Sequence, residues 1–371
     1  MARPSSSLAK WQHPLSFNSS RHWRRLLRMN GGVDPGFRLR AALVSALSRL
    51  TAPTRALERL VYGSRVNAVA VQEPPVLILG YWRSGTTHLH NLMSQDPRLG
   101  FVSTLQAMIP NGALVGRRVF RQMMLWTIPP TRPMDNMAFS PDLPQEDEFA
   151  LCHQVPYSIY TGLFFPRNRH ALYEKYATFD GLTPEELAEW QEAYLAVIKK
   201  ATLLFGGRRL VLKNPANTGR IPHLLRLFPD AKFIHIHRNP YTVFRSAMKL
   251  MLSLREIMPF QHVGEQEIED DVFYLYRAML QRYLAEKDEI PAGNLVEVRY
   301  DDLDQHPIEE LARVYSALSL PGWREAEAPI ARYLAGQAGY VKNRFTLSPE
   351  DCAKIEEHWG FAIDAWGYSR P

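Results

Sequence analysis

Residues 75–87 constrain the fold more than any other part of this 371-residue chain. The short apolar run Val76–Gly80 reads as a buried strand, and Gly85–Thr87 opens a segment of helical character after a turn. A buried strand that leads into a helix through a tight turn is typical of α/β folds. The free N–H groups at the start of such a helix bind anions. The segment therefore predicts a sheet-based protein with an anion-binding loop.

The spacing of this loop resembles that of a Walker A loop, GxxxxGK[ST], which cradles phosphate oxygens. Thr86 stands where that loop carries its lysine, and the cation of the loop is Arg83. The missing lysine disfavours ordinary nucleoside triphosphate chemistry and indicates a different activated anion. A P-loop kinase-type phosphotransferase that uses ATP stays open as an alternative function.

A second strand–helix boundary lies at residues 231–246. The strand is expected to end at Arg238, and Asn239-Pro240 predicts a helix start, because Asn caps a first turn and Pro fits its first position. Ser246 lies about two helical turns beyond Asn239 and so returns to the face of the cap. Arg238 and Ser246 are therefore predicted to hold one phosphate between them. Two separate anion sites suit a nucleotide with groups at its 3′ and 5′ positions.

Four segments, in the same order along the chain, resemble those of sulfotransferases. Arg83–Thr87 is similar to the 5′-phosphosulfate loop of that family, and Arg238 with Ser246 is similar to its 3′-phosphate site. Leu212–Ala216 is similar to the Lys-Asp-Pro segment of tyrosylprotein sulfotransferases, whose lysine is catalytic. Gly339–Thr346 is similar to the Lys-Asn-x-Phe-Thr segment that covers the nucleotide in cytosolic sulfotransferases.

The resemblance implies a sulfotransferase that moves a sulfuryl group from 3′-phosphoadenosine 5′-phosphosulfate to a hydroxyl of an acceptor. The transferred group carries one negative charge, so side-chain cations and N–H groups suffice and no metal is expected. Arg83 and Lys213 are expected to be catalytic by this resemblance. The expected donor-binding residues are Arg83, Ser84, Gly85, Thr86, Thr87, Arg238, Ser246, Lys342, Asn343 and Arg344.

The residue that accepts the acceptor's proton is not fixed by the resemblance. Tyrosylprotein sulfotransferases have a catalytic glutamate at a position that this chain fills with Val102–Thr104. Other sulfotransferases use a histidine whose distance from the loop cation corresponds roughly to the segment that follows Gln145. The candidates are therefore Glu146, Glu148 and His153, either as carboxylate or as neutral imidazole. The glutamates could instead simply begin a helix, where negative charge is favourable.

Two histidines, His235 and His237, would share one face of the strand before Arg238. Metal sites also use this spacing, which makes a metal-dependent hydrolase a rival hypothesis. It needs further ligands, and the sequence offers no clear third one. Arg238 would also place a cation beside the metal, so no metal site is assigned.

The chain is expected to form an α/β fold, a P-loop-like parallel β-sheet with helices on both faces in three layers. Strands are expected at Val76–Gly80, Leu210–Lys213, Phe233–His237 and Leu295–Arg299, with helical patterns between them. We predict two parts: a basic helical N-terminal arm at 1–70 and a single domain at 71–371. Within that domain, residues from about 105 to 175 are rich in Pro and Met. This composition favours an irregular acceptor pocket or lid, or else a satellite core beneath long loops.

The positive charge of the chain is concentrated in the arm. Residues 1–79 hold twelve Lys and Arg against three acids, a charge of +9, which leaves −3 of the total +6 for residues 80–371. Binding to nucleic acid is therefore a poor explanation of the basic pI. The segment 38–50 places Leu39, Leu43, Leu47 and Leu50 on one helical face among arginines. It could lie on an anionic membrane or pack on the domain. The first 33 residues contain no acid and many Ser and Arg, which is also typical of a targeting segment.

Composition also limits the compartment and the acceptor. We find no apolar run long enough to span a bilayer. The two cysteines, Cys152 and Cys352, cannot build a disulfide framework, so a cytoplasmic enzyme is expected, with peripheral membrane contact through the arm left open. The Met-rich middle favours a small apolar or lipid-like acceptor with a hydroxyl, for example a quinone-like or phenolic molecule; a sugar stays open.

Overall fold

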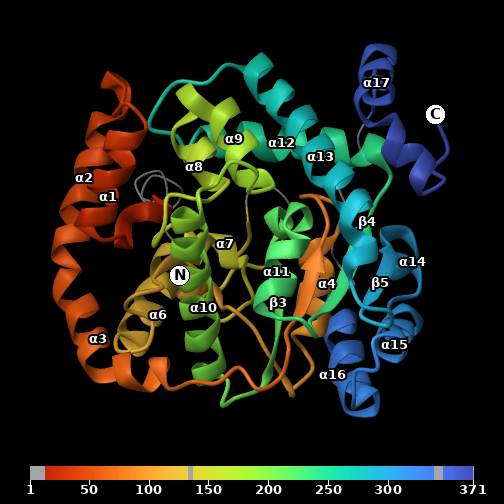
Figure 1. Cartoon of the computed structure of the whole chain (residues 1–371), viewed down its shortest axis with the longest axis horizontal. Coiled ribbons are helices and arrows are strands. Elements are labelled where there is room, and N and C mark those ends of the chain that lie inside the picture. The colour runs from red at the N-terminus through yellow and green to blue at the C-terminus, as the bar shows by residue number, and fades with distance from the viewer. Residues whose placement is uncertain (1–12, 133–136, 338–345, 371) are drawn as a thin grey trace. The chain divides into compact units, whose positions relative to one another are not determined.

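A computed structural model describes residues 13–132, 137–337 and 346–370 of the chain. The fold has two compact units, each assembled from three stretches of sequence (Figure 1). The first unit comprises residues 1–72, 101–207 and 252–264, and the second comprises 73–100, 208–251 and 265–371. All five strands belong to the second unit, which therefore carries the sheet edge to which the sequence assigns the anion site.

The sheet of the second unit is entirely parallel, with the strand order β2-β3-β1-β4-β5. Its strands are β1 (Val76–Leu79), β2 (Leu99–Gly100), β3 (Arg209–Lys213), β4 (Lys232–His237) and β5 (Leu295–Arg299). The central strand β1 is buried over its full length, as expected where helices cover both faces of a parallel sheet. The four strands expected from the sequence are confirmed to within a residue. The two-residue strand β2 was not predicted, because so short a segment has no periodicity to detect.

Helices cover the sheet in two groups. One group contains α4 (Thr86–Met93), α14 (Tyr300–Gln305), α15 (Pro307–Ala317) and α16 (Trp323–Gly336). The other contains α11 (Ile221–Leu227), α13 (Glu265–Glu286), α17 (Pro349–Ala365) and the 3-10 helix η5 (Pro215–Gly219). A further helix, α12 (Pro240–Arg255), follows β4 directly. The expected α/β fold with helices on both sides of a parallel sheet is confirmed.

An aromatic cluster anchors the loop after β1 to the second group of helices. The ring of Tyr276 stacks on Trp359 at 3.8 Å between centroids, and Tyr81 meets Tyr276 edge-on at 5.0 Å. Phe244 and Phe273 complete the cluster and are stacked on each other at 4.7 Å. All five side chains are buried. Because Tyr81 belongs to the loop itself, packing of this core fixes the position of the loop backbone.

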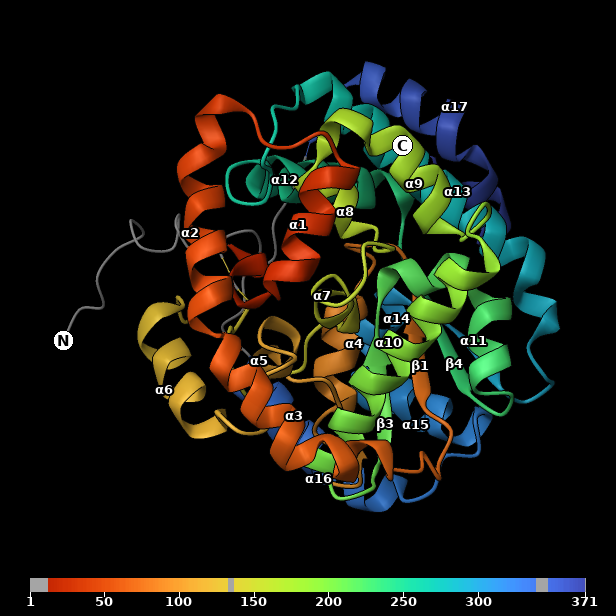
Figure 2. The same cartoon turned by 60° about the vertical axis from the view of Figure 1, so that its left-hand side comes forward.

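The first unit is helical. Its helices are α1 (Ser20–Met29), α2 (Arg38–Leu50), α3 (Ala52–Asn67), α5 (Thr104–Met108), α6 (Arg117–Thr127), α7 (Asp147–Leu151), α8 (Tyr160–Phe164), α9 (Arg169–Ala177) and α10 (Pro184–Leu204) (Figure 2). The longest, α10, begins with a reciprocal capping box: the hydroxyl of Thr183 accepts from the amide of Glu186, whose carboxylate accepts from the amide of Thr183. The sequence pattern Thr183-Pro-Glu-Glu186 predicts this start, and the structure confirms it.

The segment from about 105 to 175 is more regular than its composition predicts, since five helices begin or lie within it. Part of it forms a satellite core, in which Met124 packs with Leu105, Ile109 and Ala113, and partly buried Met108 and Met123 line the same cluster. This favours the satellite-core interpretation of the methionines. The segment lies in the same unit as the N-terminal arm. The predicted division at residue 70 into an arm and a single domain stays a prediction.

A buried ion pair ties three segments of the first unit together. The ammonium of Lys200 in α10 lies 2.8 Å from one carboxylate oxygen of Glu58 in α3, which is 3% exposed. The other oxygen accepts from the amides of Leu114 and Val115, at 2.8 and 3.4 Å. The carboxylate therefore supports both the position of α3 and the turn that precedes α6.

We expect Glu58→Ala to lower the free energy of unfolding by about 3 kcal/mol, because it leaves a largely buried lysine without its partner and two amides without an acceptor. Glu73→Ala is the matched control, since Glu73 pairs with Arg209 at 2.9 Å while 55% of its own side chain is exposed. That loss should stay below about 1 kcal/mol. Urea unfolding followed by circular dichroism measures both, and equal losses would contradict the role given to Glu58.

Candidate anion-binding site at the sheet edge

The loop between β1 and α4 has an unusual backbone. Gly80, Arg83 and Gly85 all have positive φ angles, of 134°, 73° and 102°. Glycine adopts such angles freely, but for Arg83 the left-handed conformation costs about 1–2 kcal/mol. Strain of this kind persists only where surrounding contacts hold it, and it gathers at functional sites.

Close packing explains why glycines flank this loop. A Cβ on Gly80 would lie 2.4 Å from the carbonyl oxygen of Ile236, and one on Gly85 would lie 2.3 Å from the ring of Tyr300. The amide of Gly80 also donates to the hydroxyl of Thr218 at 2.8 Å. The loop is thus held against the neighbouring strand β4 and against the first residue after β5.

The start of α4 lies at the end of the loop. Gly85 is the N-cap residue. Among the described residues, no side chain caps this helix start, and the first turn contains no acidic residue. The N–H groups of a first helical turn have no partner inside the helix and carry a partial positive charge. The first turn, which includes Thr86 and Thr87, is therefore suited to bind an anion.

Three cationic side chains extend the site along the same edge of the sheet. Lys213, at the end of β3, is 1% exposed, and its ammonium lies 3.5 Å from the hydroxyl of Thr87. The Nε of Arg83 donates to the hydroxyl of Ser246 at 2.8 Å. The guanidinium of Arg238 lies 4.1 Å from the centre of the Tyr300 ring. These groups converge because parallel strands present their carboxyl ends at one edge.

The pairing within this group differs in one respect from the sequence-based expectation. Arg238 and Ser246 were expected to hold one phosphate together, but the hydroxyl of Ser246 accepts a hydrogen bond from Arg83. Arg238 approaches the same loop, with one nitrogen 3.5 Å from the carbonyl oxygen of Arg83. The N-cap role of Asn239 is supported, because its side chain accepts from the amide of Tyr241 at 3.0 Å. A phosphate site shared by Arg238 and Ser246 stays a prediction.

Two residues of the site were not identified from the sequence. Tyr300 packs against Gly85 on one side and carries the guanidinium of Arg238 on its ring. Thr218 fixes the amide of Gly80. The position of Tyr300, directly after a predicted strand, was a usable signal, since the residue after a parallel strand lies at the ligand-binding edge. Thr218 gave no such signal.

His235 and His237 lie in an aromatic stack rather than in a group of metal ligands. The ring of Trp366 stacks on both, with centroid distances of 5.3 and 4.9 Å, and Tyr283 stacks on His235 at 3.8 Å. Burial lowers the pKa of His237 to about 4, and its Nδ1 lies 2.8 Å from the hydroxyl of Tyr368. Among the described residues no three metal-binding side chains gather.

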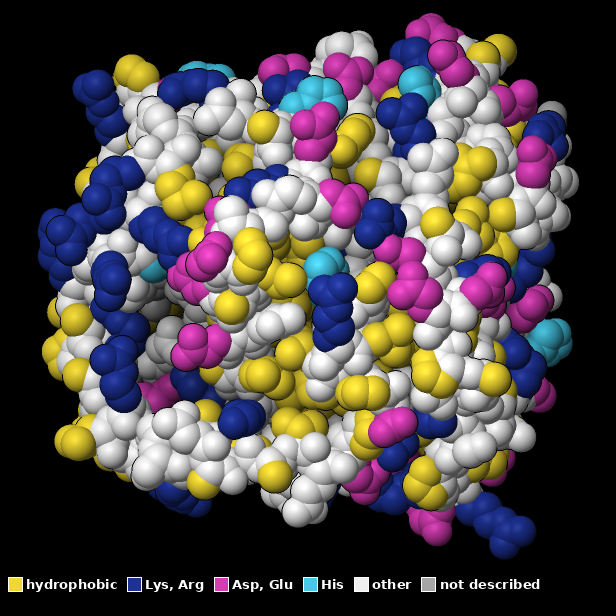
Figure 3. All heavy atoms as spheres, viewed as in Figure 1, with side chains coloured by type: hydrophobic (Ala, Val, Ile, Leu, Met, Phe, Trp, Pro, Cys, Tyr) yellow, Lys and Arg dark blue, Asp and Glu magenta, His cyan; other side chains and the backbone are white. Residues whose placement is uncertain are grey.

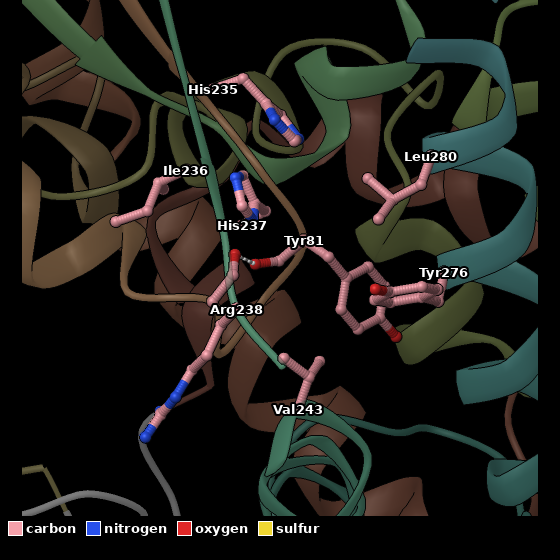
Figure 4. Close-up of a pocket in the computed structure, with 9 residues that line it drawn as sticks. Tyr81, His235, Ile236, His237, Arg238, Val243, Tyr276 and Leu280 are labelled. Atoms are coloured by element: carbon pink, nitrogen blue, oxygen red, sulfur yellow. Dashed lines mark hydrogen bonds between the residues drawn. The ribbon is translucent and has the colours of Figure 1, made fainter. Parts of the chain in front are cut away.

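Figure 4 shows the gap between this stack and the loop. The gap is lined by Tyr81, Ser84, His235, Ile236, His237, Arg238, Val243, Tyr276 and Leu280, and it is too narrow to admit a water molecule. The side chain of Arg238 extends away from the two histidine rings (Figure 4). The histidines therefore belong to the packing beneath the strand end, and Arg238 belongs to the anion site.

The three candidate bases lie in the first unit. Glu146 is the N-cap residue of α7, is 7% exposed, and accepts a hydrogen bond from the hydroxyl of Tyr160. Glu148 is fully buried and accepts from the amide of Ile159 at 3.1 Å. His153 is 1% exposed, and burial, with smaller contributions from nearby basic side chains, lowers its pKa to about 3. Which of these acts as a base stays a prediction.

The predicted cover segment, with Lys342, Asn343 and Arg344, lies outside the described residues. Its role as part of the donor site therefore stays a prediction. The remaining predicted donor-site residues all belong to the second unit.

Comparison with known proteins identifies the family to which this chain is similar. Residues 74–325 match the model of the sulfotransferase family. The chain is 33% identical, over 374 aligned positions, to the omega-hydroxy-beta-dihydromenaquinone-9 sulfotransferase Stf3 of Mycobacterium bovis and to that of Mycobacterium tuberculosis. Each alignment covers 99% of this chain and 95% of the relative.

Two solved structures of sulfotransferases have the same fold as this chain. The sulfotransferase STF9 of Mycobacterium avium superposes with a TM-score of 0.68 at 20% identity, covering 94% of this chain and 96% of that one. The sulfotransferase STF1 of Mycobacterium tuberculosis superposes with a TM-score of 0.65 at 19% identity, covering 92% and 90%. At such identities the likeness establishes the fold.

We expect Gly85→Ala to destabilise the protein by about 3 kcal/mol, because it adds a clash with the Tyr300 ring to the strain of a positive φ. Gly181→Ala is the matched control: Gly181 has a φ of 85° but no atom within 4 Å of the added carbon. It should cost only the strain, about 1–2 kcal/mol. Thermal unfolding midpoints compare the two, and equal shifts would show that the contact with Tyr300 does not restrict this position.

Proposed function

From the premise that this chain belongs to the sulfotransferase family and is itself a sulfotransferase, we propose its donor, its class of acceptor and the roles of its residues. The donor is 3′-phosphoadenosine 5′-phosphosulfate, and the acceptor is a hydroxyl on an apolar, lipid-like molecule. The family assignment confirms the resemblance found in the sequence. Nothing in the fold or the comparisons favours the alternative of a kinase that uses ATP.

One observation carries the donor assignment: the uncapped start of α4 lies beside Arg83 and Lys213, with Arg238 against the same loop. In this proposal the amides and hydroxyls of Thr86 and Thr87 hold the 5′-phosphate, as expected of a helix N-terminus. Ser84 and Gly85 shape that loop. Arg238 and Ser246 bind the 3′-phosphate at the other end of the nucleotide.

The sulfuryl group passes in line from the bridging oxygen of the donor to the acceptor hydroxyl, much as a phosphoryl group does. Charge accumulates on the leaving phosphate as the S–O bond breaks. Lys213 and Arg83 stabilise that charge, and the burial of Lys213 strengthens its effect because the local dielectric is low. The acceptor hydroxyl loses its proton to a base as the new S–O bond forms.

The acceptor class rests on the named activity of the curated relatives, which act on omega-hydroxy-beta-dihydromenaquinone-9. Such a molecule combines a long apolar body with a hydroxyl. We propose an acceptor of the same class for this chain. The abundance of Met and aromatic residues between about 105 and 175 suits an apolar acceptor, although part of it serves the satellite core.

Glu146 is the best-supported base of the three candidates. It is the most exposed of them, and its carboxylate accepts a hydrogen bond from the hydroxyl of Tyr160, which orients it. The hydrogen bond from the amide of Ile159 gives Glu148 a structural role. With a pKa of about 3, His153 holds a proton too weakly to be an efficient base near neutral pH.

We propose that the reaction takes place in the cytoplasm, at or near a membrane surface. Both cysteines are free, Cys152 buried and Cys352 partly exposed, which suits a reducing compartment. None of the helices in the described part of the chain is long and apolar enough to cross a bilayer.

Arg238→Ala should weaken the binding of adenosine 3′,5′-bisphosphate by roughly 10- to 100-fold, the usual loss for one charge-assisted contact. Arg209→Ala is the control, because Arg209 lies at the opposite end of β3 in an ion pair with Glu73. Isothermal titration calorimetry measures both affinities. Unchanged affinity in Arg238→Ala would contradict the assignment of the donor site. A loss of affinity in both variants would indicate general instability.

Glu146→Gln should lower kcat by about 10²- to 10⁴-fold with little change in donor affinity, because it removes proton transfer and leaves the nucleotide site untouched. Glu148→Gln and His153→Asn serve as comparisons in the same assay with a phenolic acceptor. A kcat that stays near the wild-type value in Glu146→Gln, but falls in one of these, would move the base there.

A further inference from the structure

Large hydrophobic side chains that are strongly exposed gather on a few helices of the first unit. Among the described residues they are Met29 in α1, Leu39 and Leu50 in α2, Leu57, Leu60 and Val61 in α3, and Val119 and Trp126 in α6. The described part of the second unit contributes none to this set. Single exposed hydrophobic residues are normal on a protein surface, but such a concentration marks an interaction site.

The exposed residues of α3 and α6 form one stripe on each helix. On α3, Leu57, Leu60 and Val61 are strongly exposed, whereas Glu58 is buried and bonded within the unit. On α6, Val119 and Trp126 turn away from buried Met124. Leu60 is 81% exposed and Trp126 is 72% exposed, so the first unit itself does not cover these stripes.

Contacts inside the first unit hold these two helices next to each other. The carboxylate of Glu58 accepts from the amides of Leu114 and Val115, directly before α6 begins. A Cβ on Gly112 would touch both the side chain of Thr54 in α3 and the ring of Phe120 in α6. The helices lie side by side in both views (Figures 1 and 2). We call their exposed stripes, with the arginines beside them, the α3–α6 face.

Positive charge dominates this surface, although Arg121 of α6 is paired with the exposed Asp142. Six arginines on the three helices are exposed and have no carboxylate partner in the described part of the chain: Arg38, Arg49, Arg59, Arg65, Arg117 and Arg118. The one acid within α2, α3 and α6 is Glu58, which is buried and bonded to Lys200. Figure 3 shows basic side chains next to hydrophobic ones along the outer side of α2 and α3.

We propose that the α3–α6 face docks on the surface of an anionic lipid bilayer. Leu60, Val61 and Trp126 would enter the boundary between headgroups and acyl chains, while the arginines of α2, α3 and α6 meet the anionic headgroups. The six arginines without a carboxylate partner, next to apolar stripes, match that surface in both charge and polarity. Tryptophan also favours this boundary, where one end of its ring is apolar and the other is wet.

This surface differs from the one that the sequence suggested. One of the alternatives left open was that Leu39, Leu43, Leu47 and Leu50 form a membrane-facing side of α2. Only Leu39 and Leu50 are strongly exposed, because α2 packs through Val44 and Ser48 on the rest of the unit. The proposal rests on the membrane location in the proposed function and deepens it by naming the face that docks, and vesicle binding is measured without the acceptor.

Co-sedimentation with vesicles tests the proposal on the full-length protein. The probes are vesicles of phosphatidylglycerol and phosphatidylcholine in equal parts, and vesicles of phosphatidylcholine alone. The protein should bind the anionic vesicles at least tenfold more strongly, and added salt should weaken that binding, since headgroup charge attracts the arginines. Equal binding to both kinds of vesicle, or binding to neither, would overturn the proposal.

Two double variants separate the contributions of apolar and charged residues. Leu60→Ser with Trp126→Ser should lower vesicle binding at least tenfold, and Arg59→Gln with Arg65→Gln should lower it by a similar factor, at roughly fivefold per arginine. The matched control is Arg324→Gln with Arg332→Gln, which removes two exposed arginines from α16 in the second unit. Binding by the control should equal that of the wild type.

Two further measurements keep these outcomes distinct. Thermal midpoints and the affinity for adenosine 3′,5′-bisphosphate should be unchanged in all variants, because the substituted side chains are exposed and lie outside the donor site. Sedimentation equilibrium tests whether a second copy covers the same face. A dimer that Leu60→Ser with Trp126→Ser dissociates, together with unaltered vesicle binding, would assign the face to self-association and overturn the bilayer proposal.

Discussion

The contact between Gly85 and the ring of Tyr300 is the constraint on which the anion site depends. The ring leaves no room for a side chain at residue 85, so the chain can turn there only through a glycine with positive φ. The same ring carries the guanidinium of Arg238 at 4.1 Å. One aromatic side chain thus joins the loop after β1, the residue after β4 and the end of β5, and it sets where α4 begins relative to the strand ends.

The charges at this edge suit an anionic ligand. Arg83, Lys213 and Arg238 share one edge of the sheet, and like charges repel each other. The Ser246 hydroxyl, the Tyr300 ring and the Thr87 hydroxyl each contact one of the three cations. In the proposed function, a polyanionic nucleotide brings opposite charge to this edge. The strained φ of Arg83 fits the same pattern, in which a site trades stability for preorganisation.

The sequence predicted what local signals determine. Four strands, the capping box at Thr183, the helix start at Asn239 and the glycine loop followed from apolar runs and cap chemistry. Contacts between distant residues could not be inferred in this way. Arg83 and Ser246 form a hydrogen bond although they are 163 positions apart in the sequence, and Tyr300 packs against Gly85, which is also distant in the sequence. The order of the strands in the sheet brings these residues together. The helices in the segment from about 105 to 175 were missed because its prolines and methionines hide the period, and the packing of neighbouring helices supplies the stability.

The chemistry of the two proposed substrates explains why two different surfaces are needed. A phosphosulfate nucleotide is a water-soluble polyanion, so its site needs cations and backbone donors, and these belong to the sheet edge of the second unit. An acceptor with a long apolar body resides in a bilayer and reaches an enzyme only at the interface. The exposed apolar residues and unpaired arginines that suit such an interface belong to the helical first unit, which also holds Glu146. In these proposals the first unit supplies the surface for meeting a lipid-like acceptor, while the parallel sheet supplies the fixed dipoles and charges on which activation of the donor depends.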